Sequence, residues 1–369
     1  MIPPLGATAD SSKAFLLSKQ VNPQKIRAFS SFSVSALGLG TYLGAHDDKT
    51  DAMYAEAIES GISRGINFID AAINYRCQRS ERIIGSTFKK LIESKKVKRS
   101  EVVIATKGGF IPFDGAPPVH LENYIRQTWI DTGLIKADDI VSNCHCLHPS
   151  YLQHQLTASL KNLGLDTIDV YYLHNPETQL PVVGEKVFYE RMREAFAFLE
   201  TQVEKGKIQV YGVATWNAFR DSSEGSVSLS KLLEIARTVG GEKHHFRAVQ
   251  LPYNFAMLEA IGKPTQSLQG KQYPILSVAH HYNMAVMISA PLLQGQLINL
   301  SPSMAKQIPG SGTTAQKCLQ FVSSTPGVVS ALAGMKSVTH VEENAQILKL
   351  NDWSEKDLQS TCDVLVKKH

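Results

Sequence analysis

Four side chains of different chemical type lie at or near the ends of short apolar runs rich in Val, Ile and Tyr. Asp70 ends one run, with Tyr75 five residues later, and Lys107 and His174 end two others. A phenol with a pKa of about 10 is a weak acid at neutral pH, and a neighbouring ammonium lowers that value. We therefore expect Lys107 to lower the pKa of Tyr75, with Asp70 holding the Lys107 ammonium in place.

An imidazole such as that of His174 can donate a hydrogen bond to a substrate oxygen. A phenol, an ammonium, a carboxylate and an imidazole together suit protonation of a carbonyl oxygen while a hydride reaches its carbon. This chemistry requires the ends of different runs to meet at one place in the fold.

The apolar runs recur with a regular spacing that predicts how their ends meet. Eight runs end near Thr41, Asp70, Lys107, His174, Thr215, Gln250, Ala290 and Gly334. Stretches with helical periodicity lie between them, over 50–64, from residue 80 and over 149–163. Strand and helix alternating eight times predict an α/β fold, a closed (β/α)8 TIM barrel whose strand ends share one face.

One interval between run ends, from Lys107 to His174, is about thirty residues longer than its neighbours, more than a βα loop of about 2–6 residues needs. We expect an insertion over about 108–147, with 108–135 covering the mouth of the pocket as a partial lid. The domain prediction is an N-terminal extension over 1–27 and a single barrel over 28–369. An extra helix is expected after residue 354.

Composition excludes several classes of protein. With 43% hydrophobic and 20% charged residues, a formal net charge of +4 and five cysteines, the chain is expected to be a soluble cytoplasmic protein without a disulfide framework. No apolar stretch approaches the roughly 18 residues that span a bilayer. The basic run over 95–99 is interpreted as a solvated helix end. Neither nucleic acid nor membrane is expected as a partner, and the oligomeric state stays open.

Four segments in register resemble the aldo-keto reductase family. They are GLGTYLG at 38–44, NFIDAAINY at 67–75 followed by Ser80 and Glu81, VIATK at 103–107, and SLKNLGLDTIDVYYLH at 159–174. The resemblance extends from about Ser33 to Leu348. It implies a (β/α)8 barrel that uses NADP(H) to reduce an aldehyde, ketone or sugar-like carbonyl reversibly, without a metal.

The resemblance also implies roles for individual residues. Tyr75 would be the general acid and base, Lys107 and Asp70 would tune it, and His174 would orient the carbonyl. The implied cofactor contacts are Gly40, Thr41, Tyr42, Asp70, Thr215, Gln250, Ser289, Pro291, Leu292, Gly334, Lys336, Ser337, His340, Glu343 and Asn344. The implied substrate contacts are Tyr42, Phe110 and Trp216. Basic residues after the last strand favour NADP over NAD, because a 2′-phosphate needs a counter-charge.

The chain departs from the family pattern at three places. Ala214 and Thr215 stand where a Ser-Asn pair commonly grips the carboxamide, and Ser289 stands where many members stack an aromatic ring on the nicotinamide. Arg76 and Arg79 lengthen a turn that is usually short, and both could face an anionic group near the pocket.

Two other functions stay open from the sequence. A cofactor-binding regulatory subunit with little turnover would carry the same motifs. A metal-dependent barrel hydrolase would use the cluster of Cys144, His145, Cys146 and His148 as soft ligands. The favoured interpretation of this cluster is a short strand leading into the helix over 149–163.

Overall fold

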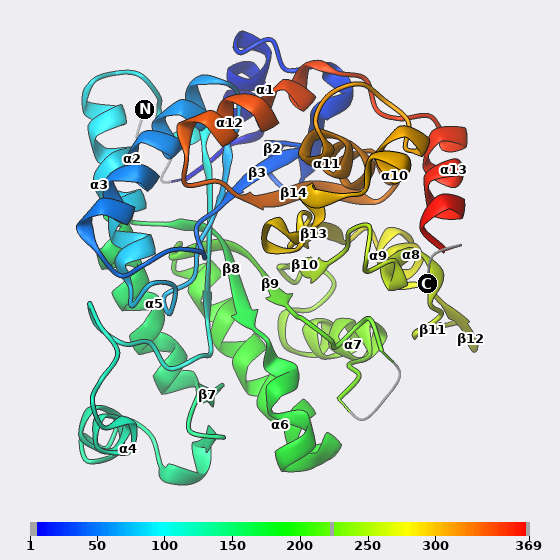
Figure 1. The fold of residues 1–369 in the computed structure, drawn as a ribbon. Coiled ribbons are helices and arrows are strands. Elements are labelled where there is room, and N and C mark those ends of the chain that lie inside the picture. The colour runs from blue at the N-terminus through cyan, green and yellow to red at the C-terminus, as the bar shows by residue number, and fades with distance from the viewer. Residues whose placement is uncertain (1–5, 222–224, 367–369) are drawn as a thin grey trace.

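The computed structural model, which describes residues 6–221 and 225–366, is a closed barrel of eight parallel strands surrounded by helices (Figure 1). The barrel strands are β3 (Leu37–Gly40), β4 (Phe68–Asp70), β5 (Val103–Gly108), β8 (Ile168–His174), β9 (Ile208–Ala214), β10 (Phe246–Pro252), β13 (Ala285–Ser289) and β14 (Val328–Gly334). They pair in this order, and β14 pairs with β3 to close the ring. The predicted TIM barrel is confirmed, and each strand ends within two residues of its predicted position.

The helices of the outer ring follow the strands as the periodicity predicted. They are α2 (Asp48–Ser63), α3 (Arg79–Glu93), α5 (Pro149–Leu163), α6 (Leu180–Glu204), α7 (Leu229–Gly240), α9 (Ile275–His281), α11 (Thr314–Ser324) and α12 (Val338–Ala345). In α5, Pro149 occupies the first turn and Gly164 ends the helix in a left-handed conformation, which glycine adopts without a Cβ clash. Leu152 and Leu156 on its inner face are fully buried.

The segment before the barrel is folded against it. It contains α1 (Ala9–Ser18) and a hairpin of β1 (Ile26–Phe29) and β2 (Phe32–Ser35). Phe29 and Phe32 pack in one apolar cluster with Phe68 and Val103, the first residues of β4 and β5. The hairpin, which the sequence did not reveal, therefore covers the barrel at the face opposite the catalytic strand ends.

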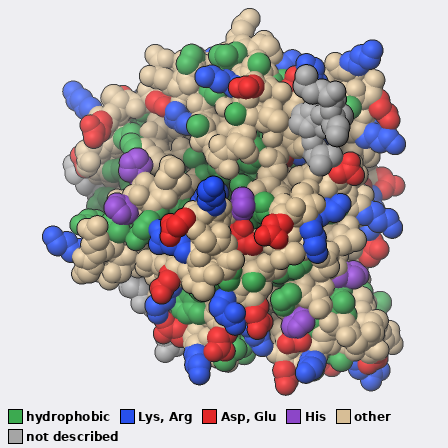
Figure 2. Space-filling model, turned by 180° about the vertical axis from the view of Figure 1, so that it is seen from behind, with side chains coloured by type: hydrophobic (Ala, Val, Ile, Leu, Met, Phe, Trp, Pro, Cys, Tyr) green, Lys and Arg blue, Asp and Glu red, His purple; other side chains and the backbone are tan. Residues whose placement is uncertain are grey.

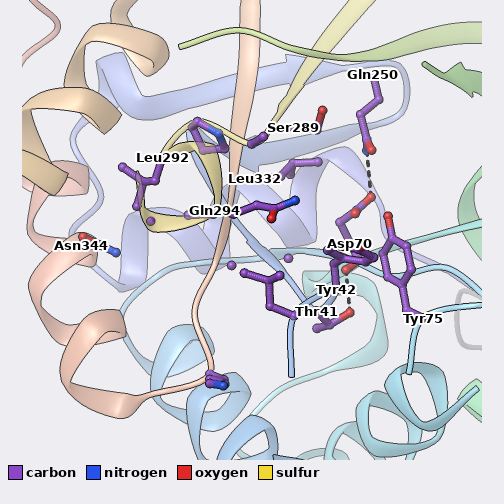
Figure 3. Close-up of a pocket in the computed structure, with 18 of the residues that line it drawn as sticks. Thr41, Tyr42, Asp70, Tyr75, Gln250, Ser289, Leu292, Gln294, Leu332 and Asn344 are labelled. Carbon is purple, nitrogen blue, oxygen red and sulfur yellow. Dashed lines mark hydrogen bonds between the residues drawn. The ribbon is translucent and has the colours of Figure 1, made fainter. Parts of the chain in front are cut away.

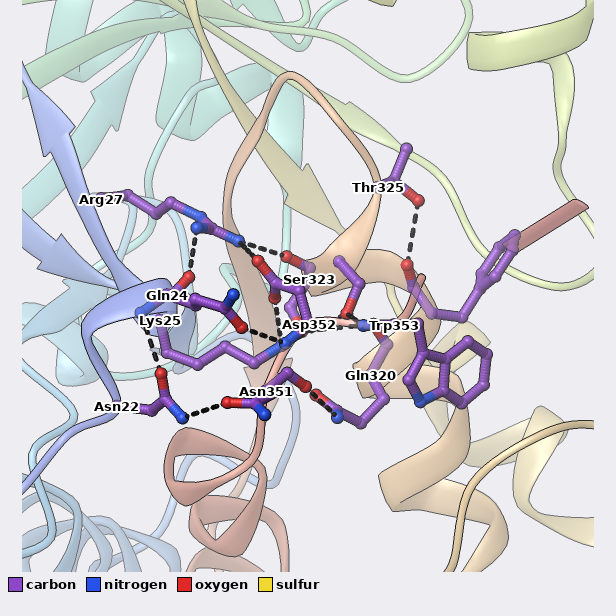
Figure 4. Close-up of polar contacts among 12 residues, drawn as sticks. Asn22, Gln24, Lys25, Arg27, Gln320, Ser323, Thr325, Asn351, Asp352 and Trp353 are labelled. Atoms are coloured by element: carbon purple, nitrogen blue, oxygen red, sulfur yellow. Dashed lines mark hydrogen bonds and ion pairs between the residues drawn. The ribbon is translucent and has the colours of Figure 1, made fainter. Parts of the chain in front are cut away.

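A buried polar cluster joins this segment to the C-terminal part of the chain (Figure 4). Lys25, which is fully buried, lies 2.6 Å from the Asp352 carboxylate and 3.0 Å from the Ser323 hydroxyl. Arg27 pairs with the same carboxylate at 2.6 Å. Burial lowers the pKa of Lys25 to about 8 although Asp352 opposes the shift. The predicted extra helix, α13 (Glu355–Val366), follows directly.

The insertion after β5 contains α4 (Leu121–Ile125), a π-helical turn over 126–130, and a small hairpin of β6 (Ile140–Val141) and β7 (His145–Cys146). It has its own apolar cluster around Trp129 and Ile135, and in Figure 1 it lies at the lower left, below α5. Of its residues only Phe110 lines the large cavity described below. The expected lid over the pocket mouth is therefore wrong, because this segment buries its apolar residues among themselves and against Tyr151 of α5.

Apart from short 3₁₀-helical turns, four smaller elements complete the described chain. They are α8 (Glu259–Gly262), β11 (Gln266–Leu268), β12 (Lys271–Tyr273) and α10 (Pro302–Gln307). Basic and acidic side chains are interspersed over the face seen in Figure 2. Within residues 6–221 and 225–366, no helix has the length and apolarity needed to cross a bilayer.

Candidate active site

The four residues singled out first are brought together at the carboxyl ends of the strands. The Lys107 ammonium lies 2.6 Å from the Asp70 carboxylate, 2.8 Å from the Ala71 carbonyl oxygen and 3.2 Å from the Tyr75 hydroxyl oxygen. An ammonium has three N–H donors, so these contacts account for all of them. Lys107 has no solvent exposure and Asp70 is also buried. The carboxylate thus fixes the ammonium directly beside the phenol.

Lys107 stays protonated although it is buried. Desolvation opposes the charged form, but the pKa of Lys107 is raised above its ordinary value by Asp70 and by Tyr75. A buried cation paired in this way acts as a permanent positive charge at the phenol oxygen.

The phenol itself does not titrate as the sequence suggested. Burial raises the pKa of Tyr75, and the attraction of Lys107 offsets only part of that shift, with Asp70 adding to the rise. Lys107 lowers the pKa of Tyr75 as expected, but the net shift is upward, because desolvation of a phenolate outweighs one nearby cation. Tyr75 is held as the protonated acid at neutral pH.

The imidazole of His174 lies beside the phenol ring. The two ring centroids are 5.6 Å apart in an edge-to-face arrangement, and the Phe110 ring lies 4.9 Å from that of His174. Burial, reinforced by the charge of Lys107, lowers the pKa of His174 well below its ordinary value, so the imidazole is neutral. Its Nδ1 is buried without a hydrogen-bond partner.

A cavity of about 930 Å³ opens over these residues and extends from Tyr75 toward α12 (Figure 3). Lys107 lies behind its wall, whereas Asp70, Tyr75 and His174 line it. The predicted cofactor and substrate residues that line it are Gly40, Thr41, Tyr42, Phe110, Thr215, Trp216, Gln250, Ser289, Pro291, Leu292, Gly334, Lys336, His340, Glu343 and Asn344. Ser337 is not among the lining residues and instead occupies the N-cap position of α12.

The two ends of the cavity differ in chemistry. At the catalytic end, Gln250 donates a hydrogen bond from its amide nitrogen to Asp70 at 2.9 Å, as Figure 3 shows. At the far end, Lys336 and His340 supply basic side chains, and the Asn344 amide oxygen is buried without a partner. A long cavity with an acid at one end and basic groups at the other fits an elongated anionic ligand such as a dinucleotide.

The family model named "Aldo/keto reductase family" matches residues 36–306. The chain belongs to the aldo/keto reductase family of oxidoreductases. A protein of Glycine max described as "Probable aldo-keto reductase 1" is 27% identical over 198 residues, which cover 53% of this chain but only 45% of that protein. The NADP(+) aldo-keto reductase yakc of Schizosaccharomyces pombe is 23% identical over 372 residues, covering 90% of this chain and 89% of its own.

A solved structure shows the same reductase fold. The aldo/keto reductase of Klebsiella pneumoniae, crystallised with NADP and acetate, superposes with a TM-score of 0.63 at 23% identity, covering 93% of this chain and 95% of its own.

Two arginines that could have faced an anionic group near the pocket do not line it. Arg76, which is buried, forms an ion pair with Asp51, and Arg79 pairs with both Asp48 and Asp51. The acidic first turn of α2 therefore takes up both charges, because it packs beside the turn after Tyr75. Arg76 and Arg79 are therefore paired within the protein and do not face a substrate anion.

The cysteine and histidine cluster forms a short strand that leads into α5, as the favoured interpretation held. His145 and Cys146 form β7, and His148 caps α5 by accepting from the Ser150 backbone N–H at 3.3 Å. Among the described residues, no group of three or more His, Cys, Asp or Glu side chains is placed to hold a metal ion. The described part of the chain therefore offers no support for the metal-dependent hydrolase.

Several cavity residues were missed by the sequence reasoning. They include Leu43, Tyr54, Asn74, Asn175, Gln294, Ile298, Thr313, Thr314 and Ala315. Thr313 is the N-cap residue of α11, so the N-terminus of this helix forms part of the cavity wall. The glycine, serine and threonine run over 310–314 is the signal that could have indicated it, since backbone N–H groups at such a terminus favour anions.

Proposed function

We propose that this reductase reversibly reduces an aldehyde, ketone or sugar-like carbonyl to an alcohol with NADP(H), using Tyr75 as the general acid and base. The observation that supports this most directly is the contact of the Lys107 ammonium with both Asp70 and the Tyr75 hydroxyl beside the cavity. NADPH, when bound, supplies a hydride. The protein must then supply a proton and hold the carbonyl in place.

The four residues divide that work. The Tyr75 hydroxyl is protonated at neutral pH and can pass its proton to the carbonyl oxygen, leaving a phenolate that the Lys107 ammonium stabilises. Neutral His174 can donate an N–H to the same oxygen and so orient it. In the oxidation direction Tyr75 would have to act as a phenolate, which takes the proton from the alcohol.

The walls beside these residues indicate the kind of substrate. Tyr42 and Trp216 are large, partly exposed apolar side chains on the cavity rim, and Phe110 lies beside His174. No Lys, Arg, Asp or Glu other than Asp70 lines the cavity at the catalytic end among the described residues. We propose a neutral substrate with an apolar portion beside its carbonyl, held by these three aromatic residues.

The choice of cofactor rests on the basic groups at the other end of the cavity. Lys336 is exposed there, where it can pair with a phosphate. The relative from Schizosaccharomyces pombe is an NADP(+) aldo-keto reductase, and the Klebsiella pneumoniae structure contains NADP.

All five cysteines are free, which is consistent with a reducing compartment such as the cytoplasm.

NADPH is expected to bind more tightly than NADH, and Lys336→Ala should reduce that preference by about ten-fold or more, since a charge-assisted contact contributes roughly 1.5–3 kcal/mol. Quenching of protein fluorescence gives both dissociation constants. Lys205→Ala, an exposed change at the end of α6, is the control and should leave the ratio unchanged. Equal affinities of the parent protein for the two cofactors would contradict this prediction.

A turnover assay tests the proposed function. Oxidation of NADPH is followed by absorbance in the presence of neutral aromatic and aliphatic aldehydes and ketones, and the alcohol product is identified. Turnover of at least one carbonyl is expected. Tight NADPH binding without turnover of any of them would instead favour the regulatory-subunit alternative.

A further inference from the structure

A second histidine lies directly behind the active site and has no part in the reaction described above. His145, in β7 of the insertion, is completely buried. Its Nε2 lies 2.7 Å from the backbone carbonyl oxygen of His174. The insertion therefore contacts the residue expected to hold the substrate carbonyl.

A chain of hydrogen bonds continues from His145 to α6. The Gln179 amide nitrogen lies 3.1 Å from Nδ1 of His145, and Arg191 donates to the Gln179 amide oxygen at 2.9 Å. Arg191 also donates to the Asp138 carbonyl oxygen at 2.8 Å. Gln179 is as completely buried as His145, so the interior part of the chain is shielded from water.

These partners leave only one arrangement of protons along the chain. A guanidinium has donors alone, so the oxygen of the Gln179 amide must face Arg191 and its NH₂ group must face His145. Nδ1 of His145 is then an acceptor, and its Nε2–H donates to the His174 carbonyl oxygen. Burial lowers the pKa of His145 to about 4, so the imidazole stays neutral and this tautomer persists at physiological pH.

The His174 carbonyl needs this donor because the regular pairing of strands ends there. The next residue, Asn175, turns away in a left-handed conformation with φ of 45°, and the pairing of β5 with β8 ends at Gly108 and Leu173. Gly109 has φ of +133°, and a Cβ on it would lie 2.7 Å from Nε2 of His145. The glycine thus leaves the space through which the imidazole reaches the end of β8.

The same imidazole contacts one wall of the pocket. The Phe110 ring lies edge-on to His145 at 5.1 Å and to His174 at 4.9 Å. Gln155 of α5 holds the adjoining backbone, accepting from the Gly109 N–H and donating to the Phe110 carbonyl oxygen, both at 2.7 Å.

We propose that His145 is a positioning residue, which fixes the end of β8 and the Phe110 ring so that the His174 imidazole faces the substrate carbonyl. The insertion after β5 contains His145 and places it against the end of β8. The effect on catalysis rests on the proposed reductase function, whereas the effect on the His174 ring does not.

Two variants of His145 separate positioning from mere packing. His145→Phe keeps a ring but leaves the His174 carbonyl and the Gln179 amide without a partner. It is expected to lower kcat by about 10- to 100-fold, as small displacements of catalytic groups do, with little change in the dissociation constant of NADPH. His145→Gln can still offer a donor to His174 and an acceptor to Gln179, and should recover most of the lost kcat.

The ring of His174 gives a readout that does not depend on turnover. In spectra of ¹⁵N-histidine-labelled protein, His145 should show the neutral Nε2–H tautomer without titrating between pH 5 and 8. The His174 ring signals should shift or broaden in His145→Phe and return toward the parent in His145→Gln. A parent protein without turnover would refute the reductase function, while these signals would still decide the positioning role.

A third variant leaves His145 itself unchanged, so it tests the proposal even if His145→Phe does not fold. Arg191→Met removes the group that orients Gln179 and should change the His145 and His174 signals, whereas Arg193→Met, an exposed change on the same helix, should not. Parent-like His174 signals and parent kcat in folded His145→Phe would overturn the proposal. If that variant is unfolded, unchanged signals in Arg191→Met would do so.

Discussion

Tyr75→Phe is expected to lower kcat for carbonyl reduction by about 10²–10⁴-fold, the usual contribution of a positioned general acid. The substitution removes the hydroxyl that lies 3.2 Å from the Lys107 ammonium and keeps the ring that packs against Tyr42 and His174. The dissociation constant of NADPH and the thermal midpoint should therefore stay close to those of the parent. Steady-state kinetics with one carbonyl substrate measures the loss.

The control for this variant is Tyr273→Phe, which removes an exposed hydroxyl on β12 and should leave kcat unchanged. The pH profile gives a second check. Because burial raises the pKa of Tyr75, the parent should keep its rate of reduction through neutral pH and lose it only as pH rises beyond 10. Near-parent kcat in Tyr75→Phe would show that the acid is elsewhere, and His174 would be the next residue to test.

Lys107→Met is the second change with a large expected effect, because it removes the charge that stabilises the phenolate. We expect kcat to fall by about 10² or more. Since the two residues act as one unit, Tyr75→Phe combined with Lys107→Met should be scarcely worse than either change alone. Additive losses would mean that the ammonium and the phenol have independent roles.

Lys107→Met also leaves Asp70 buried without its cation, which costs about 3–5 kcal/mol of unfolding free energy when a buried pair is broken. Adding Asp70→Asn removes the uncompensated charge and should restore part of that stability without restoring activity. Urea unfolding measures this difference. Lys186→Met, an exposed change on α6, controls for the loss of a lysine and should alter neither property.

The fold could be predicted because its signal is local and repeated. Each apolar run has the length of one strand, and the helix over 149–163 has Pro149 and Gly164 at its limits. Parallel strands of a barrel all end on one face, so Asp70, Lys107 and His174 could be expected to meet although they lie far apart in the sequence.

What the sequence could not show depends on burial and on backbone groups. The pKa of Tyr75 rises because desolvation outweighs Lys107, and burial of a phenol cannot be measured from residue spacing. His145 stood out only as part of a candidate metal cluster, since its partner is the carbonyl of His174 and no side-chain pattern reveals a backbone acceptor. The ion pair of Arg76 with Asp51 could not be predicted either, because it depends on how α2 packs beside the turn after Tyr75.

The protein is expected to bring a hydride donor and a carbonyl together beside Tyr75. The most direct test of this expectation is reduction of a neutral aldehyde with NADPH carrying deuterium at both C4 positions of the nicotinamide. We predict one deuterium on the carbinol carbon of the alcohol, formed by the parent protein and reduced at least about 10²-fold in yield per unit time by Tyr75→Phe. Alcohol without deuterium at that carbon, or equal rates for the two proteins, would contradict the account.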